Sequence, residues 1–202
     1  MELLMLRTSG DPSPEALEIE TLVRRTLAGD TAAFEQIVVR YERRVMSLSL
    51  RMLRAVDDAQ DATQEVFLRA FKYIHRLDLQ KPIEPWLMRM TVNACRDIAR
   101  KKVRRHHSFS EIPAVDADPR DESKDPYAGF AWEQQRQMLW RALEGLPEKE
   151  RMAVILRDVE GFTTSEVAEI LESSEGTVRS QICRGRLRIK EAMDSMVKGG
   201  LR

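Results

Sequence analysis

Apolar residues recur along most of the chain at steps of three and four positions, and no segment keeps the two-residue alternation of a strand. Asp30 is suited to cap a first long helix, the acids Asp57 and Asp58 to open a second, and Pro85 to stand in the first turn of a third. The chain is therefore predicted to be all-α. The residues expected on the buried faces of these three helices are Phe34, Ile37, Val38, Tyr41, Val45, Leu48 and Met52, then Ala59, Ala62, Val66, Ala70 and Ile74, and then Leu87, Met90, Ala94 and Ile98.

The helical pattern is interrupted once over a long stretch, at residues 107–128. This stretch holds six acidic residues against two basic ones, together with three prolines and little periodicity. Such a composition is typical of a flexible linker. We therefore expect a flexible leader at 1–18, a small helical domain at 19–106, an acidic linker at 107–128 and a second small helical domain at 129–198.

The second domain contains a pattern typical of a DNA-reading helix-turn-helix. Thr163 and Glu166 have the spacing of a capping box, and a short helix and a tight polar turn follow. The next helix carries Arg179, Arg184 and Arg186 on its outward side, and an arginine fork can bond two acceptors on a guanine edge or a phosphate. The charge alone also fits a helical hairpin with a solvated basic face.

Two stripes on the helices of the first domain are candidate binding surfaces. Asp61, Gln64, Glu65 and Leu68 follow one another at helical spacing, and an acidic stripe with an apolar residue suits a basic partner helix. On the third helix, a basic stripe around Asn93 suits a phosphate backbone, and the Asn93 amide can bond a base that has left the stack. An ordinary solvated surface is the alternative for each stripe.

The 33 basic and 33 acidic residues give a net charge of zero, which alone argues against a nucleic-acid binder. The charges are unevenly distributed along the chain, because the acidic linker and the acidic stripe balance two basic surfaces. A net charge of zero therefore does not exclude nucleic-acid binding. Cys95 and Cys183 lack metal-ligand spacing and suit a reducing cytosol. No apolar run is long enough for a membrane span, and the N-terminus has no signal-peptide pattern. We expect a cytoplasmic protein without membrane insertion, catalytic constellation, cofactor, metal or small-molecule substrate.

Four stretches of the sequence resemble extracytoplasmic-function RNA polymerase sigma factors of the sigma-70 family, in particular the RpoE/SigW-type group. One of them, residues 143–151, resembles the helix corner that precedes the family's minus-35-reading motif. Residues 162–171 with 176–180 resemble the family's minus-35-reading motif, and residues 57–67 resemble its polymerase-binding helix. Trp86 and Leu87, followed by Asn93, Asp97 and Arg100, resemble its minus-10-reading helix. The resemblance covers both expected domains in order.

The resemblance implies a transcription initiation factor that binds core RNA polymerase and promoter DNA. It also implies an anti-sigma factor, often membrane-anchored, that masks these surfaces. The implied polymerase-binding residues are Asp58, Asp61, Gln64, Glu65 and Leu68. The implied minus-10 residues are Trp86, Arg89, Asn93, Arg96, Arg100, Lys101 and Arg104, and the implied minus-35 residues are Thr177, Arg179, Ser180, Gln181, Cys183, Arg184 and Arg186.

The sequence departs from the family's pattern at two places. Residues 79–85 contain two prolines and Ile83 where relatives usually carry glycine and an aromatic residue, and Cys183 stands where many carry a larger side chain. The promoter sequences therefore do not transfer from the family. Two other classes of protein compete with a sigma factor: a stand-alone helix-turn-helix repressor or activator, and a helical protein whose basic helix binds an acidic partner.

Overall fold

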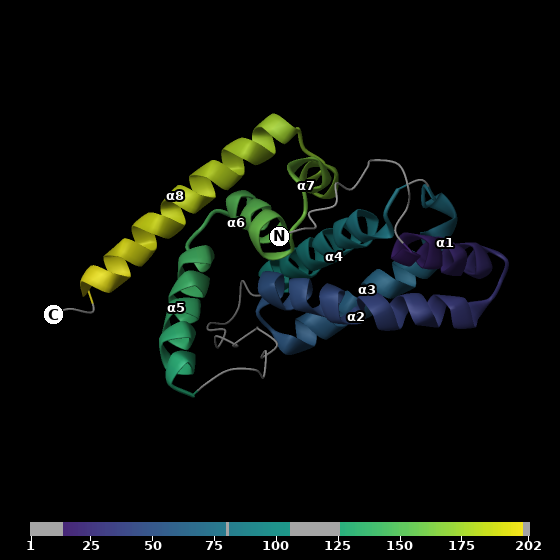
Figure 1. The fold of residues 1–202 in the computed structure, drawn as a ribbon, viewed down its shortest axis with the longest axis horizontal. Helices are drawn as coiled ribbons and strands as arrows, with labels where there is room; N and C mark the ends of the chain where they lie inside the picture. Colours follow the sequence, from purple (N-terminus) through teal and green to yellow (C-terminus); the bar gives the residue numbers. More distant parts are fainter. Residues whose placement is uncertain (1–13, 80, 106–125, 200–202) are drawn as a thin grey trace, which may run out of the picture. The chain divides into compact units, whose positions relative to one another are not determined.

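The structure is a computed structural model that describes residues 14–79, 81–105 and 126–199, and every regular element within these ranges is a helix (Figure 1). The chain divides into two units, Met1–Ile112 and Pro113–Arg202, which are described separately. The predicted all-α fold is confirmed. Among the described residues, no helix combines the length and the apolar composition that a membrane crossing requires.

The first unit contains α1 (Pro14–Leu27), α2 (Thr31–Leu53), α3 (Val56–Tyr73), the short 3-10 helix η1 (Ile74–Arg76) and α4 (Ile83–Arg105). Helix α2 packs against α1, α3 and α4, and α3 also packs against α4. The buried face predicted for the second helix is confirmed at Ala59, Ala62, Val66 and Ala70 of α3 and at Ile74, which begins η1. The largest fully buried side chains of this unit are Val23, Ile37, Val45, Leu48, Val66, Leu87 and Met88.

Helix α4 buries a wider arc than its sequence pattern predicts. Met90 and Ile98, expected inside, are only half-buried, whereas Met88, Val92 and Cys95 are fully enclosed. The reason is that α4 packs against both α2 and α3, so that two of its sides face the core. Val38 and Met52 of α2 are likewise half-buried.

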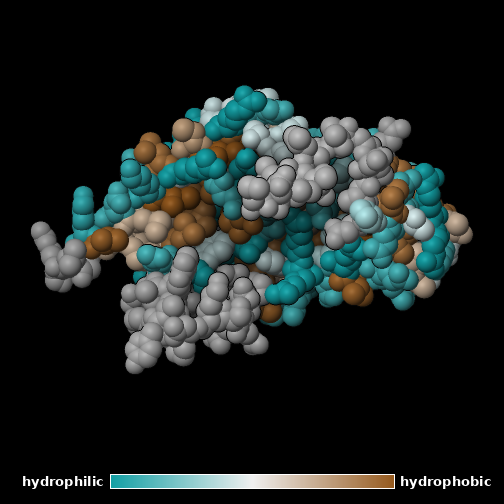
Figure 2. All heavy atoms as spheres, in the orientation of Figure 1, coloured by the Kyte–Doolittle hydropathy of each residue, from teal (hydrophilic) through white to brown (hydrophobic). Residues whose placement is uncertain are grey.

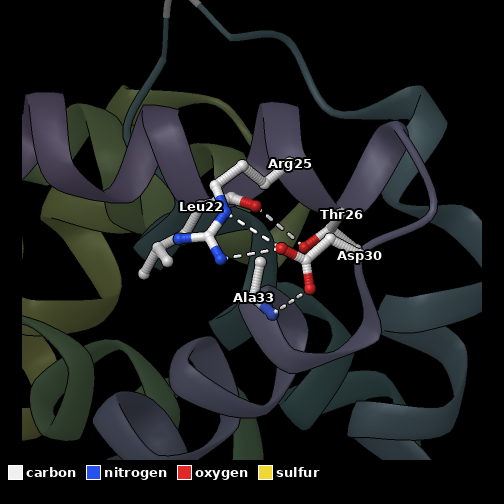
Figure 3. Close-up of polar contacts among 5 residues, drawn as sticks. All are labelled: Leu22, Arg25, Thr26, Asp30 and Ala33. Atoms are coloured by element: carbon white, nitrogen blue, oxygen red, sulfur yellow. Dashed lines mark hydrogen bonds and ion pairs between the residues drawn. The ribbon is translucent and has the colours of Figure 1, made fainter.

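The corner between α1 and α2 is held by Asp30 (Figure 3). Its carboxylate accepts a hydrogen bond from the Ala33 N–H at 3.2 Å and two from the Arg25 guanidinium at 2.7 and 3.0 Å. The bonds from Arg25 and then from Ala33 hold the pKa of Asp30 below its usual range. The predicted cap is confirmed. The flexible leader expected at 1–18 is wrong for 14–18, because Pro14 begins α1; residues 1–13 lie outside the described ranges.

The second unit contains α5 (Pro126–Glu144), α6 (Glu148–Val154), which continues into the π-helical turn η2 (Ile155–Val159), then α7 (Thr164–Leu171) and α8 (Glu175–Gly199). The expected linker overlaps α5 at 126–128, and its remaining residues lie outside the described ranges. Helix α8 packs against α5, α6 and α7. The largest fully buried side chains here are Leu143, Met152, Ile155, Leu156 and Ile170.

The helix-turn-helix is formed by α7 and α8, and local hydrogen bonds define both helix starts. The Thr163 hydroxyl accepts from the Glu166 N–H at 3.2 Å, and the Glu166 carboxylate accepts from the Thr163 N–H at 2.7 Å. This confirms the predicted capping box. At the next helix start, the Ser174 hydroxyl accepts from the Thr177 N–H at 3.2 Å. Between the helices Glu172 adopts a left-handed conformation with φ 52°.

We expect Glu172→Gly to stabilise the second unit by roughly 0.5–1 kcal/mol. Glycine adopts positive φ without the steric cost of a side chain, and Glu172 is exposed, so the substitution removes no buried contact. Thermal or urea unfolding measures the effect. The same substitution at Glu191, an exposed position inside α8, should destabilise by a similar amount, and a loss of stability at both positions would contradict the prediction.

Candidate nucleic-acid and protein-binding surfaces

The outward face of the first half of α8 carries four residues of the predicted minus-35 set. Thr177, Arg179, Ser180 and Cys183 are all exposed. Arg179 forms an ion pair at 2.8 Å with Glu175 on its own helix, and 68% of its side chain remains exposed. The Ser180 hydroxyl donates to the Gly176 carbonyl, so its oxygen is held close to the helix surface. This face presents one arginine, two hydroxyls and one thiol to solvent.

Gln181 does not belong to this face. It is 7% exposed, on the same side of α8 as Val178 and Ile182, and its Oε1 has no hydrogen bond among the described residues. The prediction that Gln181 reads a base edge is therefore corrected. Helix α8 packs against both α6 and α7, which brings this position into the buried arc.

Three arginines in the second half of α8 contact acidic residues of α6 and η2. Nε of Arg184 lies 3.3 Å from Oε1 of Glu150, and Nε of Arg188 lies 3.2 Å from Oε2 of the same carboxylate. Arg186 donates through Nε at 2.9 Å and Nη2 at 2.5 Å to the two oxygens of Asp158. These hydrogen bonds from Arg186 to Asp158 raise the pKa of the Arg186 guanidinium. Arg186 thus ties α8 to η2 through two donors of its fork.

On α4, five residues of the predicted minus-10 set share the face opposite the buried core: Trp86, Arg89, Asn93, Arg96 and Arg100. Arg100 is exposed and the other four are half-buried. Lys101 is exposed at the edge of this face, and the side chain of Arg104 lies outside the described residues. This face therefore carries several cationic groups, one amide and one indole ring.

The segment before Trp86 is also helical. Helix α4 begins at Ile83, which is 4% exposed and belongs to the core. Pro85 is therefore the third residue of the helix, where its missing N–H is not needed. Ile83 anchors the start of α4 and is not presented to a ligand.

The residues predicted to bind polymerase on α3 differ in their contacts. Asp58, which the resemblance implied and which lies outside the predicted stripe, accepts a hydrogen bond from Lys102 at 2.7 Å that ties α3 to α4. Its role in polymerase binding stays a prediction. Glu65 is half-exposed and pairs at 2.6 Å with Arg69, which also contacts Asp97 on α4. Asp61, Gln64 and Leu68 remain exposed.

A groove of about 560 Å³ lies between α2 and α3, and two of these exposed residues, Gln64 and Leu68, line it. Leu68 and Phe71 line it with 61% and 48% of their surface exposed. The ring of Phe71 packs edge-on against the ring of Phe34, with 5.0 Å between the ring centroids. Phe71 was missed at the sequence level, although its position three residues after Leu68 continues the same stripe. The groove is lined by Thr31, Phe34, Glu35, Val38, Glu42, Met46, Gln60, Thr63, Gln64, Phe67, Leu68 and Phe71.

The second unit has an apolar groove of its own, about 490 Å³ in volume. Figure 2 shows hydrophobic residues gathered between α8 and α5, where this groove opens. Its apolar lining is Leu139, Leu143, Val154, Val159, Ile189 and Met193. Such a surface suits a protein contact better than a phosphate backbone. Within the described ranges, His, Cys, Asp and Glu side chains nowhere gather in threes as a metal site would need.

Comparison with known proteins places both units in one family. The sigma-70 region 2 family model matches residues 37–105, and the sigma-70 region 4 model matches residues 136–189. The extracytoplasmic-function RNA polymerase sigma-E factor of Escherichia coli strain K12 is 34% identical over 190 residues, which cover 91% of this chain and 96% of the relative. The RNA polymerase sigma-H factor of Pseudomonas aeruginosa is 26% identical over 89% of this chain and 95% of the relative.

Two solved structures share the fold. CnrH in complex with the cytosolic domain of CnrY matches with a TM-score of 0.66 at 21% identity, covering 88% of this chain and 98% of that one. The sigma factor RpoE in complex with the anti-sigma factor NepR from Bartonella quintana matches with a TM-score of 0.65 at 22% identity, covering 80% and 96%. With both sigma-70 regions present in order and a sigma-E factor matched over nearly its whole length, the chain belongs to the extracytoplasmic-function RNA polymerase sigma factors.

Proposed function

We propose that this sigma factor binds core RNA polymerase through its first unit and selects promoters with two separate DNA-binding faces. The face of α4 around Asn93 contacts the minus-10 element, and the outward face of α8 reads the minus-35 element. The observation that carries the proposal is that cationic and hydrogen-bonding side chains share one face on each of these two helices, opposite the buried core. Such faces combine phosphate binding with base-edge contacts.

For the minus-35 element, the exposed set supports direct contacts by Thr177, Arg179, Ser180, Cys183 and Arg184. Gln181 is excluded by its burial, and Arg186 serves mainly as the tie to Asp158. For the minus-10 element, Asn93 is the candidate to bond a base outside the stack. Trp86, Arg89, Arg96, Arg100, Lys101 and Arg104 are proposed to border that base and the phosphates around it.

For the polymerase, the α2–α3 groove supports docking of a partner helix that is basic and apolar. Leu68 and Phe71 offer apolar surface, and Glu35 and Glu42 supply negative charge in the lining. The exposed Asp61 adds a negative charge two turns before Leu68 on α3. An apolar anchor surrounded by complementary charge is the arrangement that gives an interface both affinity and orientation.

We further propose that an anti-sigma factor, cytosolic in the part that binds, covers these surfaces until it is released. Two relatives of the same fold support this proposal, since RpoE was solved with the anti-sigma factor NepR and CnrH with the cytosolic domain of CnrY.

Transcription from a promoter library tests the whole proposal. Core polymerase alone should give no specific transcript, and addition of the full chain should select promoters that share two spaced elements. Absence of both polymerase co-elution and specific transcripts would favour the stand-alone helix-turn-helix protein or the helical interaction protein.

Asp61→Lys is expected to weaken binding of the full chain to core polymerase by roughly tenfold, about 1.4 kcal/mol. The substitution places a cation beside the α2–α3 groove, where it repels a basic partner helix. Competition binding with a labelled wild-type chain measures the effect. The matched control is Glu169→Lys on α7, which makes the same charge change in the second unit; equal weakening by both would remove the polymerase-binding role from the groove.

Arg179→Ala is expected to reduce discrimination between the preferred minus-35 element and single-base variants by about 1–3 kcal/mol at one position. The guanidinium lies on the outward face of α8 and is 68% exposed, so its loss leaves the fold intact. Promoter selection with the variant measures the change. Unchanged promoter choice would show that Arg179 does not contact a base.

A further inference from the structure

Glu150 is an unusual residue for the inside of this unit. It lies on α6, is 7% exposed and directs its carboxylate at two arginines of α8. A buried carboxylate is costly unless paired, and an apolar residue of similar volume often stabilises a fold at least as well. Stability alone therefore gives little reason for a glutamate at this position.

The two arginines contact Glu150 in a way that leaves their outer nitrogens available. Both use Nε, at 3.3 Å for Arg184 and 3.2 Å for Arg188, and their side chains are 60% and 54% exposed. Among the described residues, no terminal nitrogen of either guanidinium donates a hydrogen bond to this carboxylate. Arg186 differs, because it bonds Asp158 with Nε and with one terminal nitrogen.

The charges at this cluster do not cancel. Two guanidinium groups share one carboxylate, whereas the pairs of Arg179 with Glu175 and Arg186 with Asp158 are each neutral. Oε2 of Glu150 also has no hydrogen bond within the described part of the chain, so Arg188 is attracted but not tightly aligned. The cluster therefore has one positive charge that its own carboxylate does not neutralise, and this charge is available to bind an anion.

The position on α8 indicates which anion. Arg184 and Arg188 are four residues apart, one turn or about 6 Å along the axis, and lie at the edge where α8 meets α6. The centre of the outward face belongs to Ser180 and Cys183. A pair of cations at the edge of a reading helix lies closer to the DNA strand beside the groove than to the base edges at its centre.

We infer that Arg184 and Arg188 form a phosphate clamp for duplex DNA and that Glu150 is its positioning residue. The inference deepens the proposed function, on which it rests, and adds two residues to it. Glu150 attracts both Nε groups from the buried side as an ion-pair partner, which leaves the terminal nitrogens to contact one phosphate or two neighbouring phosphates of one strand. Arg184 thereby acts on the backbone as well as at the border of the minus-35 element.

Arg188→Gln tests the clamp. Fluorescence anisotropy measures the affinity of the full chain for short duplexes of different sequence over a series of KCl concentrations. The variant should bind every duplex more weakly, and by the same factor. The slope of log K against log salt should become shallower by about 0.9, the value for one lost phosphate contact. Lys190→Gln removes the same charge from the same helix outside the cluster; equal effects of both variants would overturn the clamp.

Glu150→Gln tests the positioning role by the sign of its effect. The variant makes the chain one unit more positive, so a residue that merely competes with DNA for the arginines would give tighter binding when replaced. Positioning predicts instead that duplex affinity falls, by about threefold or more. Tighter or unchanged binding would overturn the role of Glu150.

A double variant separates positioning from loss of folding. In an Arg184→Gln and Arg188→Gln background, Glu150→Gln should have no further effect on duplex affinity, because there is nothing left to position. An equal loss in both backgrounds would show a general structural effect and overturn the inference. Thermal unfolding of each variant accompanies the measurement.

The readouts also separate this inference from the proposed function. Arg188→Gln should leave minus-35 discrimination intact while lowering affinity, and lost discrimination would make Arg188 a base reader instead of a clamp. If the wild-type chain with core polymerase selects no promoter, the proposed function fails. The salt slope and the sign of the Glu150→Gln effect still decide the clamp.

Discussion

Gly185→Val is expected to lower the free energy of unfolding of the second unit by about 2–3 kcal/mol and to abolish minus-35 reading with it. An ideal Cβ at position 185 would lie 2.7 Å from Cγ2 of Val154 and 3.4 Å from the backbone oxygen of Glu150. Val154 is buried, and its β-branched side chain has essentially one rotamer in a helix, so it cannot turn aside. The helices α6 and α8 must therefore separate, which disturbs the clamp and the reading face together.

Thermal unfolding and duplex binding measure this effect, and two further variants isolate its cause. Gly176→Ala is the matched control, because a Cβ there meets nothing within 4 Å, and it should be neutral or stabilising by up to about 1 kcal/mol. The pair Gly185→Ala with Val154→Ala exchanges the clashing methyl groups. The double variant should have a higher free energy of unfolding than the sum of the two single changes predicts. If the two changes simply add, the close contact between α6 and α8 is refuted.

Cys183 is expected to react with a thiol reagent at pH 8 at least about 100-fold faster than Cys95. Cys183 is exposed on α8, whereas Cys95 is 0% exposed inside α4. Burial raises the pKa of the Cys95 thiol to about 11. At pH 8 such a thiol is ionised in roughly one molecule in a thousand, and the thiolate is the reactive form.

Mass spectrometry after timed modification measures both rates in the folded chain. Cys183→Ser should remove the fast phase, and in denaturant both thiols should react alike. Duplex DNA should slow the modification of Cys183 if the outward face of α8 lies against it. Equal reactivity of the two thiols in the folded chain would contradict the burial of Cys95.

Local signals in the sequence were enough to predict most helices and their starts. The capping box of Thr163 and Glu166 and the cap at Asp30 are both confirmed, because each depends on hydrogen bonds between residues three positions apart. The buried face of α3 is confirmed for the same reason, since apolar spacing fixes which side of a helix faces the core. Family membership can also be predicted from the sequence, because it depends on short contiguous motifs that occur in the family's order along the chain.

Helix α1 was missed although its signals are local. Pro14 stands at its first residue, where proline is well suited, and Ile19, Leu22 and Val23 form its buried face. Pro12 and Pro14 favoured a leader in the sequence. Helix α1 is stabilised by the packing of this face against α2 and by the hydrogen bonds of Asp30 at the corner between the two helices.

The sequence by itself therefore determined the helices, most of their inward sides and the two faces rich in cations. Only the tertiary structure decided which polar residues remain available: it buries Gln181, pairs Asp58 with Lys102 and joins Arg184 and Arg188 to Glu150. Periodicity gives the direction of a helix face but not the width of the arc that its neighbours cover. Ion pairs between residues more than thirty positions apart depend on how the helices pack, and no local pattern encodes that distance.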